Sequence, residues 1–205
     1  MAGMQKKVLS LGDGGKLVLK SPNGKVEDIT RGALHCAYLV IDCSTSMVGT
    51  KLAEAKKGAM EFTKDALTKG YSVGLIQFAS EAKLICEPET KISALHLYIE
   101  KLLAKGSTNM TEGIKLATNK LGTRKGLNAM VVVTDGEPDD PNSALDVAHQ
   151  AKAKGIDIIA IGTDDADRDF LSKLASRTDL AVMVSRDQLG QGIASAAKML
   201  PGASK

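Results

Sequence analysis

The sequence predicts a doubly wound α/β domain, and three observations support this prediction. After the first 35 residues, short β-rich runs alternate with amphipathic helical segments. Three runs are continuously apolar, as in parallel strands that are buried on both faces: 38–41, 130–133 and 158–161. Only Ser80-Glu81 separates two other strand candidates, a link that allows a hairpin but no parallel crossover. We therefore expect a mostly parallel six-stranded sheet with one antiparallel edge strand and helices on both faces.

The individual elements follow from hydrophobic periodicity. The expected strands are 37–42, 72–79, 83–86, 129–134, 157–161 and 180–184. The expected helices are 51–69, 93–103, 111–121, 141–154, 168–176 and 188–200. In the first helix, Leu52, Ala55 and Ala59 begin an apolar stripe at helical spacing, with lysines and glutamates on the opposite side. Such a stripe is typical of a helix that packs on a sheet.

The first 34 residues form a separate region in this prediction, and residues 35–205 form the α/β domain. Short β-like pieces at 8–11, 16–19 and 26–29 alternate with turn signals, which indicates a small hairpin or meander. The turn at 12–15 is rich in glycine but lacks the GK[ST] ending of a phosphate-binding loop, and it leads into a strand. We interpret it as a turn.

Composition narrows the class of protein. The chain has 205 residues, 43% of them apolar, and its formal charge of +3 is too small and too evenly spread to indicate a nucleic-acid partner. Its three cysteines form no CxxC pair, which favours a reducing compartment. No signal peptide is evident, and no apolar segment approaches the roughly 20 residues that span a bilayer. We expect a cytoplasmic protein that has no membrane partner.

Oxygen-bearing side chains follow the first buried strand at every second position. Asp42, Ser44 and Ser46 come directly after the apolar run at 37–41. Alternate residues of an extended segment point the same way, so these three side chains can converge, while Cys43 points to the other side and is expected in the core. Carboxylate and hydroxyl oxygens suit Mg²⁺, Mn²⁺ or Ca²⁺ rather than zinc or copper.

Two later segments carry matching chemistry. Asp135 follows the buried strand 129–134, and Thr108 lies in a loop just before a predicted helix. The functional crevice of an open parallel sheet lies beyond the carboxyl ends of its strands, where the strand order reverses. A cation is the cheapest way to keep two close carboxylates ionised. We therefore predict a divalent-metal site with five ligands: Asp42, Ser44, Ser46, Thr108 and Asp135.

The three segments together resemble the metal-ion-dependent adhesion site of the von Willebrand factor type A domain family. The matching motifs are IDCSTSM at 41–47, GSTN at 106–109 and VTDG at 133–136, and the resemblance covers roughly residues 35–200. Thr45 stands where many members carry glycine, at a position that is not expected to face the metal. The resemblance implies a sheet order of 3-2-1-4-5-6. It also implies direct coordination of Mg²⁺ by Ser44, Ser46 and Thr108, with Asp42 and Asp135 acting directly or through water.

The resemblance further implies a function. Family members commonly leave one coordination position of the metal for an acidic side chain of a partner protein. We therefore expect a non-enzymatic protein-interaction module whose partner supplies Glu or Asp; relatives inside cells work beside ATPase machines, chelatase complexes or kinases. The alternative is a Mg²⁺-dependent phosphohydrolase, since Mg²⁺ with carboxylates at strand ends also serves phosphoryl transfer. Ser44 stands where that alternative would want a second Asp, and the acidic loop of Glu137, Asp139 and Asp140 would repel phosphate.

Overall fold

The chain divides into two compact units, Met1–Leu34 and His35–Lys205. The structure, a computed structural model, describes residues 8–12, 16–20, 26–28 and 35–202. The first unit contains an antiparallel three-stranded sheet in the order β1-β2-β3. Its strands are β1 (Val8–Gly12), β2 (Lys16–Lys20) and β3 (Val26–Asp28). This is the expected meander, although most of the predicted turn residues at 12–15 and 21–24 lie outside the described residues.

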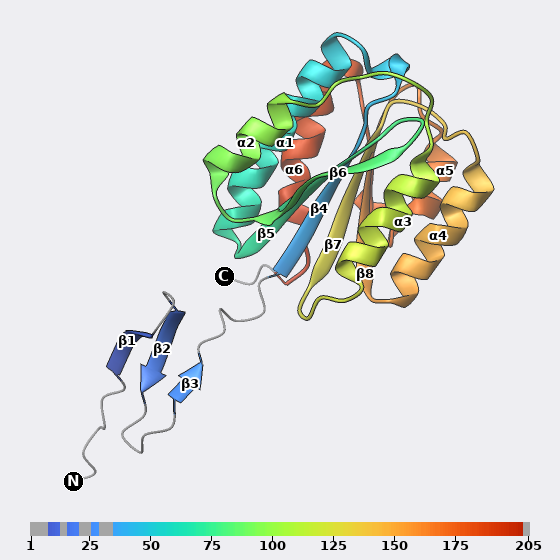
Figure 1. Cartoon of the computed structure of the whole chain (residues 1–205). Helices are drawn as coiled ribbons and strands as arrows, with labels where there is room; N and C mark the ends of the chain where they lie inside the picture. Colours follow the sequence, from blue (N-terminus) through green and yellow to red (C-terminus); the bar gives the residue numbers. More distant parts are fainter. Residues whose placement is uncertain (1–7, 13–15, 21–25, 29–34, 203–205) are drawn as a thin grey trace. The chain divides into compact units, whose positions relative to one another are not determined.

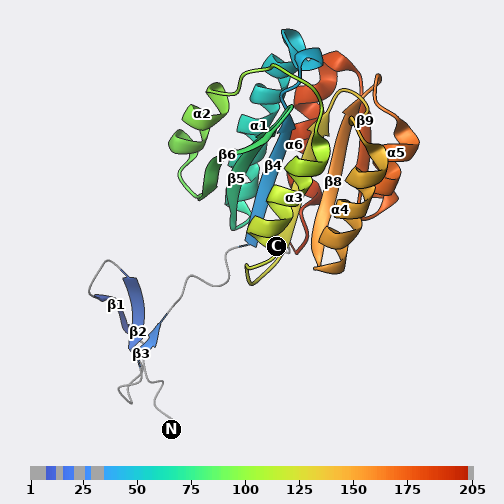
Figure 2. The ribbon, with the colours of Figure 1, turned by 45° about the vertical axis from the view of Figure 1, so that its right-hand side comes forward.

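The second unit is built on a six-stranded sheet in the order β6-β5-β4-β7-β8-β9 (Figures 1 and 2). The strands are β4 (His35–Asp42), β5 (Tyr71–Phe78), β6 (Ala82–Glu89), β7 (Asn128–Thr134), β8 (Ile156–Thr163) and β9 (Ala181–Val184). All neighbouring strands are parallel except β5 and β6, which are antiparallel. The predicted fold class and strand order are confirmed.

Helices cover both faces of this sheet, with α1 and α6 on one face and α3, α4 and α5 on the other (Figure 1). The α-helices are α1 (Thr50–Thr68), α2 (Ile92–Glu100), α3 (Met110–Leu121), α4 (Pro141–Ala153), α5 (Arg168–Leu174) and α6 (Leu189–Met199). Three short 3₁₀ helices are η1 (Thr45–Met47), η2 (Thr178–Leu180) and η3 (Arg186–Gln188). The predicted apolar stripe of α1 is buried, with Ala55, Ala59 and Phe62 fully inaccessible.

The second helix of the unit ends earlier than the sequence predicts. The periodicity extends to residue 103, but α2 ends at Glu100 and the chain then runs toward the end of β4. The backbone N–H of Lys105 donates to the carbonyl of Cys43 at 2.7 Å. This tertiary hydrogen bond requires a non-helical approach, so a contact distant in sequence overrides the local propensity.

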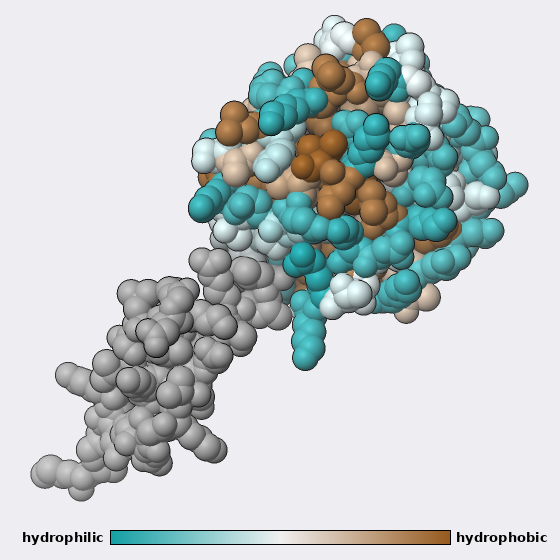
Figure 3. Space-filling view, in the orientation of Figure 1, coloured by the Kyte–Doolittle hydropathy of each residue, from teal (hydrophilic) through white to brown (hydrophobic). Residues whose placement is uncertain are grey.

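Strand β6 forms one edge of the sheet, and its neighbourhood carries an apolar surface area. Figure 3 shows brown side chains gathered over this strand. Leu84 and Ile85 of β6 are partly buried and pack on the core. The same edge carries two exposed charged side chains, Lys83 and Glu87, and it also contains Pro88, which has no backbone N–H to donate. These features oppose pairing with a strand of another molecule.

Candidate metal centre

The carboxyl ends of two neighbouring strands carry the predicted site. In the register of β4 and β7, Ile41 lies beside Val133, which places Asp42 beside Thr134 and Asp135 one residue further along the chain. Both strands are buried along almost their whole length up to these positions. Buried parallel strands therefore fix the two carboxylates at the same edge of the sheet.

Asp42 is a buried carboxylate with hydrogen bonds to both oxygens. Its exposed fraction is 0%. The backbone N–H of Ser44 donates to Oδ1 and the hydroxyl of Thr134 donates to Oδ2, each at 2.8 Å. Burial raises the pKa of Asp42 to about 6, although the hydrogen bonds from Ser44 and Thr134 oppose the shift. Two neutral donors do not fully replace the lost hydration, so this carboxylate would gain from a nearby cation.

A chain of hydroxyl groups connects the end of β4 with Asp135. The hydroxyl oxygens of Ser44 and Ser46 lie 2.8 Å apart, and the Ser46 hydroxyl donates to Oδ1 of Asp135 at 2.8 Å. Ser44 and Asp135 are each 2% exposed, whereas Ser46, within the 3₁₀ helix η1, is exposed. The structure thus brings four of the five predicted ligands into one hydrogen-bonded cluster, which a molecule in solution can reach from the Ser46 side.

Thr108, the fifth predicted ligand, is held beside the acidic loop by its backbone. Its N–H donates to Oδ1 of Asp139, and its carbonyl accepts from the Asp139 N–H, both at 3.1 Å. The loop is also tied to η1, since the N–H of Thr45 donates to the carbonyl of Gly106 at 3.0 Å. Within the described part of the chain, the hydroxyl of Thr108 makes no hydrogen bond with the cluster. The structure therefore places its loop at the site but not its hydroxyl in contact with the other four.

The acidic loop after β7 has a structural use. Asp139 holds Thr108, and Asp140 caps α4 by accepting from the N–H of Ser143 at 3.1 Å. Pro141 follows at the first position of the helix, where its missing N–H costs nothing. Two of the three acidic residues considered above are therefore explained by local structure.

A lysine that the sequence analysis missed completes the cluster. The ammonium of Lys51, in the first turn of α1, lies 2.5 Å from Oδ2 of Asp135 and 3.2 Å from Oδ2 of Asp165. Asp165 in turn accepts from Arg186 at 2.6 Å. Partial burial alone would lower the pKa of Lys51, but the two carboxylates raise it. One feature of the sequence could have identified this residue: Lys51 lies in the first turn of a predicted helix. A positive charge at that end of a helix is repelled by the helix dipole, so it needs an acidic partner.

The donor chemistry of the cluster fits a hard divalent cation. It offers two carboxylates and two hydroxyls, and one carboxylate already binds an ammonium ion. Among the described residues, no group of three or more His, Cys, Asp or Glu side chains could hold a metal ion. A site of this composition, with hydroxyls in place of further acids, would bind its ion less tightly than a carboxylate cage.

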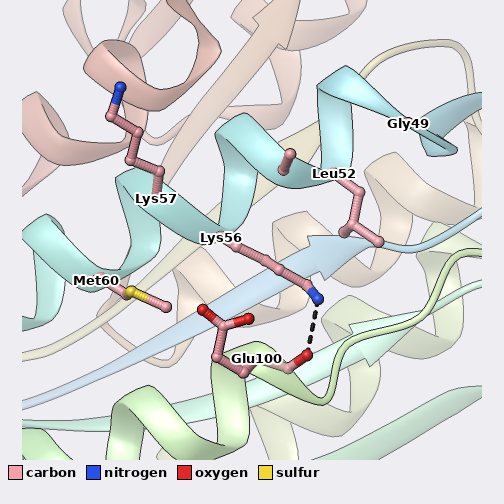
Figure 4. A pocket seen from close by; sticks show the side chains of 7 residues that line it. Gly49, Leu52, Lys56, Lys57, Met60 and Glu100 are labelled. Atoms are coloured by element: carbon pink, nitrogen blue, oxygen red, sulfur yellow. Dashed lines mark hydrogen bonds between the residues drawn. The ribbon is translucent and has the colours of Figure 1, made fainter.

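A pocket of about 440 Å³ shares no lining residue with the cluster, and Figure 4 shows the side chains that line it. It lies between α1 and the end of α2 and begins at Gly49, three residues after Ser46. Lys56 donates from Nζ to the carbonyl of Glu100 at 2.7 Å, as the dashed line in Figure 4 marks. The other lining residues are Leu52, Ala53, Lys57 and Met60. With Glu100 as its one carboxylate, this lining provides no second set of metal ligands.

Among the described residues, the cysteine and histidine side chains make no hydrogen bond to the cluster. Cys43 is fully buried, as the period-two argument predicts, and Cys36 and Cys86 are also buried. The three histidines are located at the start of β4, in α2 and in α4. None of the helices in the described ranges is both long enough and apolar enough to cross a bilayer.

Comparison with known families and curated proteins gives a consistent result. The family model of the von Willebrand factor type A domain matches residues 38–194. A UPF0353 protein of Mycolicibacterium paratuberculosis is 33% identical over an alignment of 147 positions, and the match covers 61% of this chain and 44% of that protein. A UPF0353 protein of a Mycobacterium species shows the same identity and coverage. The matched part of the chain thus spans less than half the length of these curated relatives.

Solved structures show the same fold at low identity. The vWF domain of the type V pili tip protein Mfa5 from Porphyromonas gingivalis has a TM-score of 0.74 at 15% identity, covering 84% of this chain and 97% of that one. BatB from Bacteroides thetaiotaomicron has a TM-score of 0.63 at 20% identity, with 80% and 98% covered. Proximal thread matrix protein 1 from the mussel byssus, in a structure with a zinc-occupied MIDAS motif, has a TM-score of 0.65 at 19% identity, with 80% and 46% covered.

Proposed function

Because the chain belongs to the von Willebrand factor type A domain family, we propose that it is a divalent-metal-dependent protein-interaction module. Its metal would be held by side chains at the ends of β4 and β7 and in the loop before α3. The proposed ligands are Asp42, Ser44, Ser46, Thr108 and Asp135. The bound ion would supply one open coordination position, and an aspartate or glutamate of a partner protein would occupy it.

One observation carries this proposal: Ser44 links the two carboxylates, because its backbone N–H donates to Asp42 and its hydroxyl is hydrogen-bonded to that of Ser46, which donates to Asp135. Oxygens held 2.8 Å apart are spaced as neighbours in the shell of one small cation would be. A protein of the same fold, the mussel byssus protein, has a structure with a zinc-occupied MIDAS motif, which supports a divalent ion as the ligand of this fold. We propose Mg²⁺ as the ion here, with Mn²⁺ and Ca²⁺ as the other candidates.

The phosphohydrolase alternative finds less support in the chain. An aspartyl-phosphate mechanism would want a second Asp two residues after Asp42, and Ser44 stands at that position. The acidic loop of Glu137, Asp139 and Asp140 would also repel a phosphate group. We therefore propose binding, and not catalysis, as the role of the site. The partner's identity and any association with an ATPase or kinase complex belong to this proposal and rest on the family resemblance.

Titration calorimetry with MgCl₂ and MnCl₂ tests the metal site directly. The wild type is expected to bind one ion per chain, and Asp135→Ala and Ser44→Ala to weaken binding by at least about tenfold, since each removes an oxygen ligand. Asp146→Ala and Ser93→Ala, at exposed positions in other helices, are matched controls that should retain wild-type affinity. Equal metal uptake by all five proteins would contradict the assignment.

The interaction itself is tested by affinity capture with quantitative mass spectrometry. Proteins retained by the wild type in Mg²⁺ should be released by a chelator and should not be retained by Asp135→Ala. In the captured partner, replacement of the contacting Glu by Gln or Asp by Asn should abolish retention, because a neutral amide is a poor ligand for Mg²⁺. Retention that survives both the chelator and the variant would contradict a metal-bridged contact.

A further inference from the structure

We propose that Lys51 is an internal cation of the metal centre: its ammonium neutralises Asp135 when no metal is bound and transfers to Asp165 when metal enters. This inference rests on the proposed function and deepens it, since it assigns a residue that sets how tightly the metal binds. The observation behind it is that Lys51 Nζ lies 2.5 Å from Asp135 and 3.2 Å from Asp165. The ammonium therefore already contacts both its first and its second acceptor.

The position of Lys51 is unfavourable for a positive charge in two ways, and its contact with the two acids compensates for them. It is the second residue of α1, where the helix dipole repels positive charge. Its side chain is only 16% exposed, so most of its hydration is lost as well. Asp135, with a side chain that is 1% exposed, has a matching need for positive charge. The pair thus stabilises the metal-free fold at the site where a cation is required.

A metal ion and the ammonium compete for the same oxygen atoms. Asp135 has two oxygens, of which Oδ1 accepts from Ser46 and Oδ2 binds Lys51. An ion coordinated by Asp135 would also stand within a few ångströms of a unit positive charge, and the two would repel each other in this poorly solvated place. Metal entry therefore requires Lys51 to move away from Asp135.

Asp165 makes this movement possible without leaving a buried charge unpaired. It lies in the segment between β8 and α5 and is held from the other side by Arg186 at 2.6 Å. Arg186 begins η3, which leads directly into α6. Lys51 can give up one partner and keep the other, so the free-energy cost of displacing it is the loss of one ion pair and not of two.

Calorimetry with MgCl₂ on Lys51→Gln tests the inference. The variant is expected to bind Mg²⁺ roughly tenfold more tightly than the wild type, because no ion pair has to be broken and no ammonium repels the ion. Without metal, its melting temperature should fall below that of the wild type, and saturating Mg²⁺ should remove the difference. Lys64→Gln, which loses an exposed ion pair with Glu61 on the same helix, is the matched control and should change neither quantity.

A double-mutant cycle separates transfer to Asp165 from simple repulsion. Asp165→Asn should weaken Mg²⁺ binding by roughly threefold in the wild-type background, since the displaced ammonium loses its acceptor. In the Lys51→Gln background the same change should have no effect under transfer. An equal weakening in both backgrounds would show a through-space charge effect and overturn the inference. Lys51→Arg, which keeps the charge, should bind Mg²⁺ no more tightly than the wild type and provides a second folded variant.

The outcomes distinguish this inference from the proposed function. If the wild type and Lys51→Gln bind Mg²⁺ with equal affinity, the role of Lys51 is refuted and the proposed metal site is not affected. Binding by Lys51→Gln alone would overturn the inference, because the ammonium of the wild type would then never transfer to Asp165, and it would also contradict metal binding by the natural chain. Absence of binding in both, in folded proteins, would refute the metal site and this inference together.

Discussion

Burial of Asp42 is unfavourable for its charged form, and the local chain only partly compensates. The donors to its two oxygens, the Ser44 N–H and the Thr134 hydroxyl, are both neutral. The pKa of about 6 shows that the charged form of Asp42 is still less stable than it would be in water, and a divalent ion beside it would stabilise that form. In the metal-free chain, this raised pKa should make folding stability depend on pH.

Asp42→Asn should abolish that dependence. The pKa of Asp42 is about 6 in the folded chain against an ordinary value of 3.8, so the folded state holds the proton longer as pH rises. Stability from this group is therefore fully present below about pH 4 and is lost between about pH 4 and pH 6, by at most about 3 kcal/mol. The amide of the variant does not titrate, so wild-type stability should fall relative to the variant over this range. Urea unfolding in chelator at several pH values measures both curves; parallel curves would contradict the expectation.

Gly106→Ala tests the loop that carries Thr108. Gly106 has a φ of +90°, and an added Cβ would lie 2.5 Å from the Ser80 hydroxyl oxygen. We expect a loss of about 1–2 kcal/mol in the free energy of unfolding from backbone strain, together with weaker Mg²⁺ binding as the loop shifts. The larger Gly106→Val should do the same more severely. Gly136→Ala, next to Asp135 but with nothing within 4 Å of the new Cβ, is the control. Unchanged metal affinity in Gly106→Ala would separate this loop from the site.

The sequence predicted the placement of those proposed ligands that local geometry brings together. Period-two spacing and an apolar strand were enough to bring Asp42 and Ser44 to one edge, and the strand before Asp135 placed the second carboxylate. Lys51 and Asp165 could not be paired in this way, because 114 residues separate them and charged side chains in helices usually face solvent. The hydroxyl of Thr108 depends on the conformation of a loop that carries no periodic signal.

Two helices distant in sequence cross at a pair of glycines. Gly58 of α1 and Gly190 of α6 approach so closely that a Cβ at Gly58 would lie 2.4 Å from the Gly190 carbonyl oxygen. The sequence predicted both helices, but nothing local indicates that these two glycines meet. A glycine within a helix usually lowers the stability of that helix. Here the absence of a side chain allows the two helix backbones to pack closely.

Gly58→Ala gives a clear test of that contact because two effects have opposite signs. Helix propensity alone would stabilise the folded chain by about 1 kcal/mol. The clash with backbone atoms, which cannot rotate away, should instead destabilise it by about 1–3 kcal/mol. Urea unfolding of the variant and of Lys64→Ala, an exposed control on the same helix, decides between them. A more stable Gly58→Ala would mean that the helices can separate freely.

The short link between β5 and β6 determines the direction of the second strand but not its length or its register. Two residues between the strands predicted an antiparallel pair, and this is what forms. The length of β6 was underestimated, since the strand continues from Ala82 to Glu89. Register shifts between Val73 and Ile76 interrupt the pairing, and such irregularities follow from side-chain packing across the sheet, which the sequence pattern does not encode.

The strand order of the sheet explains why the cluster of oxygen-bearing side chains forms where it does. The chain fills one half of the sheet from β4 outward to β6 and then returns to the other side of β4 with β7. Loops after β4 and β7 consequently diverge to opposite faces and leave side chains between them, which is the general reason for ligand sites at such a reversal. The whole constellation, with Lys51 and Asp165, lies within the unit His35–Lys205.

A chain shortened to residues 35–205 should therefore keep the proposed metal centre. All six strands of the sheet, the five proposed ligands and the buried residues of the described core lie within this unit. We expect the shortened chain to bind Mg²⁺ with an affinity within about twofold of the full chain, because contributions from separate, independent units add. Calorimetry on both chains measures the ratio, and Asp135→Ala in the shortened chain controls for non-specific uptake. If the shortened chain folds, as judged by circular dichroism, yet loses the ion, residues 1–34 must contribute to the site and the two units do not act independently.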